Sequence, residues 1–160
     1  MLKQNLSNDI KMELAKDKFV FSCLTGLRIS DTKDLENCID LVTGTLKKVT
    51  KKKGRIVTLP LPKIAKEIYL KYENGFPDIS DQKTNKHIQT IAKALKINKK
   101  ITYHVSRYTF ICLLLASGVD IFTVMQFAGH KDIRSTLVYA KLVSEKAEKD
   151  MSQYEEYLNL

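Results

Sequence analysis

The strongest constraint on the fold is an uncharged run from Tyr108 to Ala116, with the sequence YTFICLLLA. A run of this kind indicates burial in the core of a globular domain. His104 and Arg107 precede it with the spacing HxxR, so a helix places them on one face. We therefore expect this polar pair at the end of a buried helix, where the core can hold it rigidly.

A second apolar helix is expected directly after this run. Gly118–Val119–Asp120 interrupts the first helix, and Gly129–His130 ends the second, because glycine is the usual residue just past a helix end. Tyr139 follows a short distance further along the chain. The polar groups of the whole stretch are thus predicted to lie at the ends of packed helices.

The segment between Cys38 and Leu61 lacks the helical spacing of apolar residues. It contains three short runs rich in β-branched residues, CIDLV, TLKKV and RIVTLPL, which are separated by Thr43–Gly44 and by a KKKG turn. These runs predict a small three-stranded antiparallel sheet. Pro60 and Pro62 close it, because proline cannot donate to a strand ladder.

Helical periodicity covers most of the remaining chain. We expect further helices at 7–25, 30–35, 64–72, 80–95 and 144–157, with a short link at 140–143. The predicted fold class is α+β, mainly helical with a small three-stranded antiparallel sheet. A chain of 160 residues suits one domain, so residues 1–160 are expected to form a single unit.

The net charge is +9, from 27 Lys and Arg against 18 Asp and Glu, which favours a polyanionic partner such as nucleic acid. No apolar run reaches the roughly 18 residues of a membrane span, and the N-terminus is too polar for a signal peptide, so we expect a cytoplasmic protein without membrane contact. Cys23, Cys38 and Cys112 indicate reduced, buried thiols. With no CxxC or HExxH motif, we expect neither a metal nor another cofactor.

The tip of the predicted hairpin is strongly basic. Candidate phosphate-binding residues there are Lys47, Lys48, Lys51, Lys53 and Arg55. A basic run is often only a solvated surface, and the alternative, which its place at the tip of a hairpin in a basic chain favours, is contact with phosphate groups.

Upstream, TGLRISD places Arg28 between two predicted helices, where it either belongs to a site or is a structural arginine paired with Asp31 or Asp34. Together with KKGRIVTLPL, HxxR, Gly-His and the later tyrosine, this order and spacing resembles the catalytic domain of the tyrosine recombinases, the phage-integrase family. The resemblance implies a catalytic set of Arg28, Lys52, His104, Arg107, His130 and Tyr139.

The resemblance implies DNA cleavage through a 3′-phosphotyrosine, followed by rejoining. The residue types suit this chemistry: arginine forks bind phosphate oxygens, histidine accepts the tyrosine proton, and lysine protonates the leaving oxygen. The family often has threonine where this chain has Lys53, so Lys51 and Lys53 stay open as alternatives to Lys52. Other interpretations are a type IB topoisomerase that relaxes DNA, or a basic DNA-binding module without catalysis.

The resemblance also implies a homotetramer on double-stranded DNA. An apolar stripe in the last helix, about 144–158, is expected to dock on a neighbouring subunit. The N-terminal domain with which the family clamps DNA is expected to be absent, so DNA binding by this chain alone is expected to be weak. We also expect flexibility around 131–143, which holds the nucleophile back before assembly.

Overall fold

The computed structural model describes residues 10–52, 54–73 and 75–158, so the predicted cap Ser7 and the hairpin residue Lys53 lie outside it. The elements in chain order are α1 (Ile10–Thr25), β1 (Ile39–Asp40), β2 (Thr45–Val49), β3 (Ile56–Pro60), α2 (Lys63–Leu70), α3 (Asp81–Ala94), α4 (His104–Ala116), α5 (Ile121–Ala128) and α6 (Arg134–Leu158). The expected mainly helical α+β class is confirmed.

The strands form an antiparallel sheet in the order β1-β2-β3, as predicted. Leu46 of β2 lies opposite Leu59 of β3, and Lys48 lies opposite Val57. All four side chains are buried, because every second residue of a strand points to the same face. A lysine therefore occupies a position on the inner face where the pattern favours an apolar residue.

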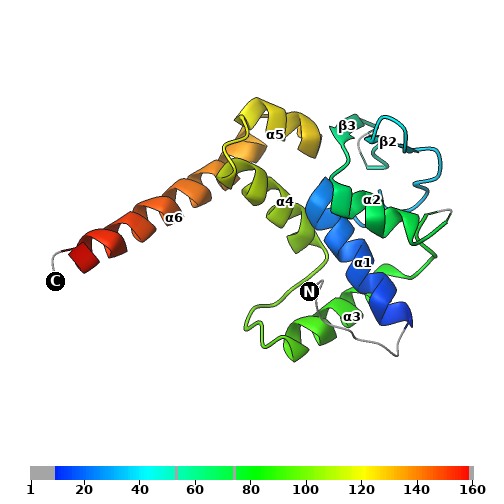
Figure 1. Cartoon of the computed structure of the whole chain (residues 1–160), viewed down its shortest axis with the longest axis horizontal. Helices are drawn as coiled ribbons and strands as arrows, with labels where there is room; N and C mark the ends of the chain where they lie inside the picture. Colours follow the sequence, from blue (N-terminus) through cyan, green and yellow to red (C-terminus); the bar gives the residue numbers. More distant parts are fainter. Residues whose placement is uncertain (1–9, 53, 74, 159–160) are drawn as a thin grey trace.

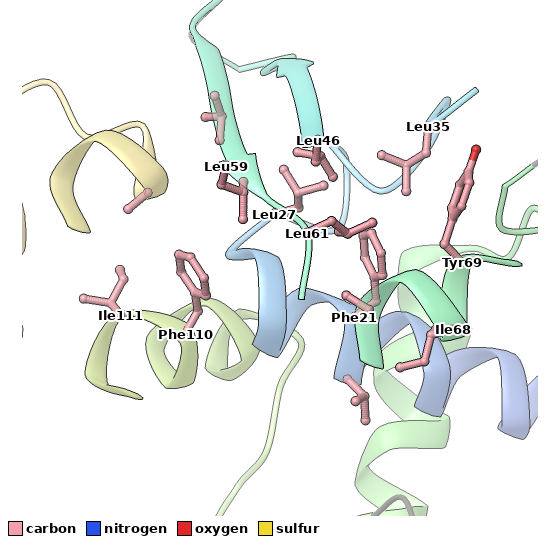
Figure 2. Packing of buried hydrophobic residues seen from close by; sticks show 14 of the residues in the cluster. Phe21, Leu27, Leu35, Leu46, Leu59, Leu61, Ile68, Tyr69, Phe110 and Ile111 are labelled. Atoms are coloured by element: carbon pink, nitrogen blue, oxygen red, sulfur yellow. The ribbon is translucent and has the colours of Figure 1, made fainter. Parts of the chain in front are cut away.

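Helix α1 is the centre of the packing, since it contacts α2, α3 and α4. Figure 2 shows Phe21 of α1 between side chains of the sheet, such as Leu46, and Ile68 of α2, with Phe110 of α4 further along the same core. Burial of each such side chain stabilises the fold by about 1.5–3 kcal/mol. The core thus connects the C-terminal end of α1, the sheet and α4. Several of the predicted site residues lie on or next to these elements.

Burial of the run from Tyr108 to Ala116 is only partial. Phe110 and Ile111 are buried, whereas Tyr108 is 41% exposed and Leu113 is 54% exposed. The expectation that the whole run is covered is wrong, because α1, α5 and α6 cover only part of the surface of α4.

Two predicted elements differ from the structure. Residues 29–33 form turns and a bend instead of a helix; Asp34 after them has a left-handed φ of 54°, and the carbonyl oxygens of Lys33 and Asp34 accept hydrogen bonds from the Lys48 side chain. The link expected at 140–143 is absent: α6 is continuous, since no glycine or proline occurs after residue 130. Figure 1 shows the second half of α6 projecting away from the rest of the molecule.

Candidate active site

Arg107 lies in the first turn of α4 and is only 5% exposed. Its Nη1 donates to the Gly26 carbonyl oxygen at 2.7 Å, and its Nη2 donates to the carbonyl oxygen of Ala128. One guanidinium therefore ties the end of α1 and the end of α5 to α4. Burial lowers its pKa to about 10, and the charge of Arg28 acts in the same direction. The group is still protonated near neutral pH.

Two glycines make the close approaches that this arrangement needs. Gly26 has a φ of 69°, and a Cβ atom there would collide with the Phe110 ring. Gly129 has a φ of 60°, and a Cβ atom would lie 2.8 Å from Val57 Cγ2. Only glycine therefore lets these turns pack against α4 and β3, and the second turn places His130 beside β3.

Arg28 is half-buried in the loop after α1, and its Nη1 lies 3.8 Å from Asp31 Oδ2. Together with His104 and Arg107 it lines a cavity of about 170 Å³. His104 itself is exposed at the start of α4. The structure thus brings together three of the predicted site residues, and two of them are arginines.

Tyr139 lies in α6 with its ring stacked on His130, at 6.3 Å between centroids and 25° between planes. The centroid of the Tyr139 ring also lies 5.1 Å from that of the Tyr108 ring. Nδ1 of His130 lies 2.9 Å from Thr136 Oγ1, which orients the imidazole. The Tyr139 hydroxyl forms no hydrogen bond with any described residue, and its charge when ionised would raise the pKa of Arg107. This tyrosine therefore lies within electrostatic range of the buried arginine.

The predicted lysines of the hairpin tip have different environments. Lys51 Nζ forms an ion pair with Asp34 Oδ2 at 2.6 Å, and the Lys51 backbone N–H donates to Asp31 Oδ1 at 2.8 Å. Lys52 is exposed, and its side chain forms no hydrogen bond or ion pair with the described residues. Lys53 lies outside the described residues.

The other candidate phosphate-binding residues also differ in their environments. Lys47 is exposed on β2, and Arg55 lines a cavity of about 380 Å³ together with His130. Lys48 differs from the expectation, because it is 6% exposed and its Nζ donates to backbone carbonyl oxygens of the Arg28 loop. A phosphate group cannot reach a lysine in this position.

The part of the chain that the structure describes contains no group of three or more His, Cys, Asp or Glu side chains placed to hold a metal ion. None of its helices is both long and apolar enough to cross a membrane.

A sequence profile described as the phage integrase family matches residues 4–146, nearly the whole chain. The chain belongs to the phage integrase family. One relative of this chain is the tyrosine recombinase XerA of Saccharolobus solfataricus. The two are 30% identical over 136 residues, which cover 80% of this chain and 46% of XerA. The chain therefore spans about half the length of a curated tyrosine recombinase.

Solved recombinase structures share the fold. XerH site-specific recombinase bound to a palindromic difH substrate has a TM-score of 0.72 at 17% identity, covering 94% of this chain and 49% of XerH. A lambda integrase dimer bound to a COC′ core site has a TM-score of 0.66 at 18% identity, covering 85% of this chain and 54% of the integrase. The described part of the chain corresponds to the catalytic domain of tyrosine recombinases.

One further candidate for the site, Asp31, did not stand out from the sequence. Asp31 is fully buried; its Oδ1 accepts the Lys51 backbone N–H, while Oδ2 faces Arg28 without a hydrogen bond to any described residue. The sequence suggested Asp31 only as an ion-pair partner of Arg28, in the interpretation where Arg28 has a structural role. Its position three residues after the arginine was the available signal, because one turn brings the two side chains together.

We predict that Asp31→Asn slows DNA cleavage by about tenfold to a hundredfold, because Arg28 loses its facing charge while the bond from the Lys51 N–H can persist. The initial rate of covalent adduct formation measures this effect. Asp78→Asn is the matched control, since that carboxylate is exposed and lies outside the site. An unchanged rate in Asp31→Asn would show that Arg28 is held without it.

Proposed function

We propose that this chain is the catalytic domain of a site-specific recombinase that cleaves and rejoins double-stranded DNA through Tyr139. The observation that carries the proposal is that Arg28, His104 and Arg107 line one cavity, and the stacking of Tyr139 on His130 supports it. Two arginines, histidines and a tyrosine can supply the charge stabilisation, the proton acceptor and the nucleophile for phosphodiester cleavage without hydrolysis.

The arginines would bind the nonbridging oxygens of the scissile phosphate. A guanidinium has five N–H groups, and Arg107 uses its two terminal nitrogens to bind the carbonyl groups of Gly26 and Ala128. These bonds orient the group before DNA arrives, so little reorganisation is needed when negative charge builds up on the phosphate. Arg28 would approach the same phosphate from the loop after α1.

Tyr139 would attack the phosphorus while the bond to the 5′ oxygen breaks. A tyrosine has an ordinary pKa near 10, so it needs a base or a cation that favours the phenolate. His130 stacks on Tyr139 and would accept the proton, and Arg107 would stabilise the anion. Lys52 would give a proton to the 5′ oxygen, which leaves as a hydroxyl. Attack of a second 5′-hydroxyl on the phosphotyrosine would reverse these steps and rejoin DNA.

We further propose that the full assembly is a homotetramer on DNA, held together by the end of α6. This end projects from the rest of the molecule and exposes the apolar side chains Met151, Tyr154, Tyr157 and Leu158. An apolar stripe of this kind favours a partner surface. The net charge of +9 and the exposed lysines of the hairpin support contact with DNA phosphates.

The test is to trap the covalent intermediate on a pool of duplexes with a randomised centre and a nick in one strand. The nick lets the short 5′-hydroxyl fragment diffuse away, so the adduct accumulates and runs slowly on a denaturing gel. Mass spectrometry of the DNA-linked peptide is expected to identify Tyr139. Sequencing the trapped DNA would then supply the preferred site.

Two results would contradict the proposal. Absence of any adduct would favour a basic DNA-binding module without catalysis. An adduct accompanied by relaxation of supercoiled plasmid, without joining of two duplexes that carry the trapped site, would favour a topoisomerase.

A further inference from the structure

Lys48 is a buried lysine that the site chemistry does not use. It lies on the inner face of β2 between Leu46 and Thr50, which are also buried, and only 6% of its surface is exposed. Burial of an ammonium group costs free energy unless its N–H groups are bonded. A lysine at this position therefore needs partners in the interior.

Its partners belong to the loop that carries Arg28. Lys48 Nζ donates to the carbonyl oxygen of Lys33 at 3.1 Å and to that of Asp34 at 2.5 Å. Asp34 has a left-handed φ of 54°, a conformation that is sterically unfavourable for most residues with a Cβ atom. One side chain of the sheet thus holds two consecutive carbonyl groups of a strained turn.

The same loop is joined to the hairpin at a second place, immediately before Lys52. There Lys51 contacts Asp31 through its backbone N–H and Asp34 through its side chain. The Lys51–Asp34 ion pair is exposed, so it contributes little by itself. Lys48 adds a connection whose donor side chain is buried.

Arg28 depends less on this connection than the hairpin tip does. It is two residues from Gly26, which Arg107 binds, and it faces Asp31. Lys52 has no partner of its own among the described residues. If the loop and β2 separate, Lys52 therefore moves relative to Arg28.

We propose that Lys48 is a positioning residue that holds Lys52 against the phosphate bound by Arg28, and that it acts on protonation of the leaving 5′ oxygen. This role rests on the proposed function, in which Lys52 supplies that proton. Lys48 itself touches neither DNA nor the reacting atoms.

The experiment compares two versions of the trapped duplex, one normal and one with sulfur in place of the bridging 5′ oxygen at the scissile phosphate. A thiol has a pKa near 8.5, so sulfur leaves as thiolate without a donated proton. Lys48→Met is expected to slow cleavage of the normal duplex by about tenfold to a hundredfold and to cleave the sulfur duplex at close to the wild-type rate. Lys52→Ala is expected to behave in the same way, with slower cleavage of the normal duplex and a rate close to wild type on the sulfur duplex.

Lys66→Met is the matched control, because Lys66 Nζ also donates to a backbone carbonyl oxygen, that of Leu41 at 2.8 Å, outside the site. It is expected to cleave both duplexes at the wild-type rate. Lys48→Gln is measured beside Lys48→Met. Its neutral amide can donate to one of the two carbonyl oxygens, so this variant is expected to destabilise the fold less. Equal slowing of both duplexes in the Lys48 variants, which a general loss of structure would cause, would overturn the role of Lys48.

Failure of the proposed function gives a different result: wild type then forms no adduct that depends on Tyr139. The position of the hairpin is still measurable by hydrogen exchange. The Lys51 N–H, which is bonded to Asp31, is expected to exchange faster in Lys48→Gln than in wild type. Unchanged exchange in a folded variant would overturn the connection itself.

Discussion

A Tyr139→Phe variant is expected to form no covalent adduct with DNA and to keep the wild-type fold. Phenylalanine has no oxygen with which to attack phosphorus, so the reaction loses its nucleophile completely. The ring can still stack on His130 and contact Tyr108, and the lost hydroxyl forms no hydrogen bond with a described residue. The adduct is measured on a denaturing gel, folding by thermal unfolding, and DNA binding by gel shift at low salt.

Tyr69→Phe is the control for this variant. Tyr69 is a buried tyrosine of α2 that packs in the core, so its replacement also removes one phenolic hydroxyl but leaves the site intact. It is expected to form the adduct at the wild-type rate. If Tyr139→Phe still formed an adduct, another residue would be the nucleophile, and the proposed role of Tyr139 would be wrong.

Arg107→Ala is expected to lose both stability and cleavage. Removal of the guanidinium leaves the buried carbonyl groups of Gly26 and Ala128 without their donor, and each such loss costs about 1–3 kcal/mol in the free energy of unfolding. Cleavage should fall by about a hundredfold to a thousandfold, as expected for loss of one preorganised donor to the phosphate. Chemical denaturation measures the first effect and adduct formation the second.

Arg107→Lys separates charge from geometry. A lysine keeps the positive charge, but it cannot replace the planar fork that bonds both carbonyl groups. Arg107→Lys should therefore show most of the loss of stability and of cleavage that is expected for Arg107→Ala.

Arg28→Ala is the contrasting variant, because Arg28 is half-buried and its side chain makes no polar contact with a described residue other than the 3.8 Å ion pair with Asp31. It should lose a comparable share of cleavage, whereas its loss of stability comes from the buried Asp31 carboxylate, which is left without a facing cation. If Arg107→Lys were as stable and active as wild type, the two carbonyl bonds would not be what fixes the site.

Local patterns in the sequence determined most of the secondary structure. Helix α3 begins where Ser80 accepts the Lys83 N–H, and α5 begins where Asp120 accepts the Thr123 N–H and ends at the left-handed Gly129. These signals act between neighbouring residues, so they can be identified without the fold. The order of the polar motifs likewise indicated the family, which the profile match over residues 4–146 confirmed.

Tertiary contacts decided what the local pattern could not. The helix expected at 30–35 is replaced by turns, and the carbonyl groups at its end bind Lys48, a residue far along the chain. Lys48 and Lys51 look alike in a basic run, yet one is buried and the other is exposed. The role of Asp31 as a bridge also required the hairpin to fold against the loop. Burial and long-range hydrogen bonds depend on which segments meet in space, and that information exists only once the chain has folded.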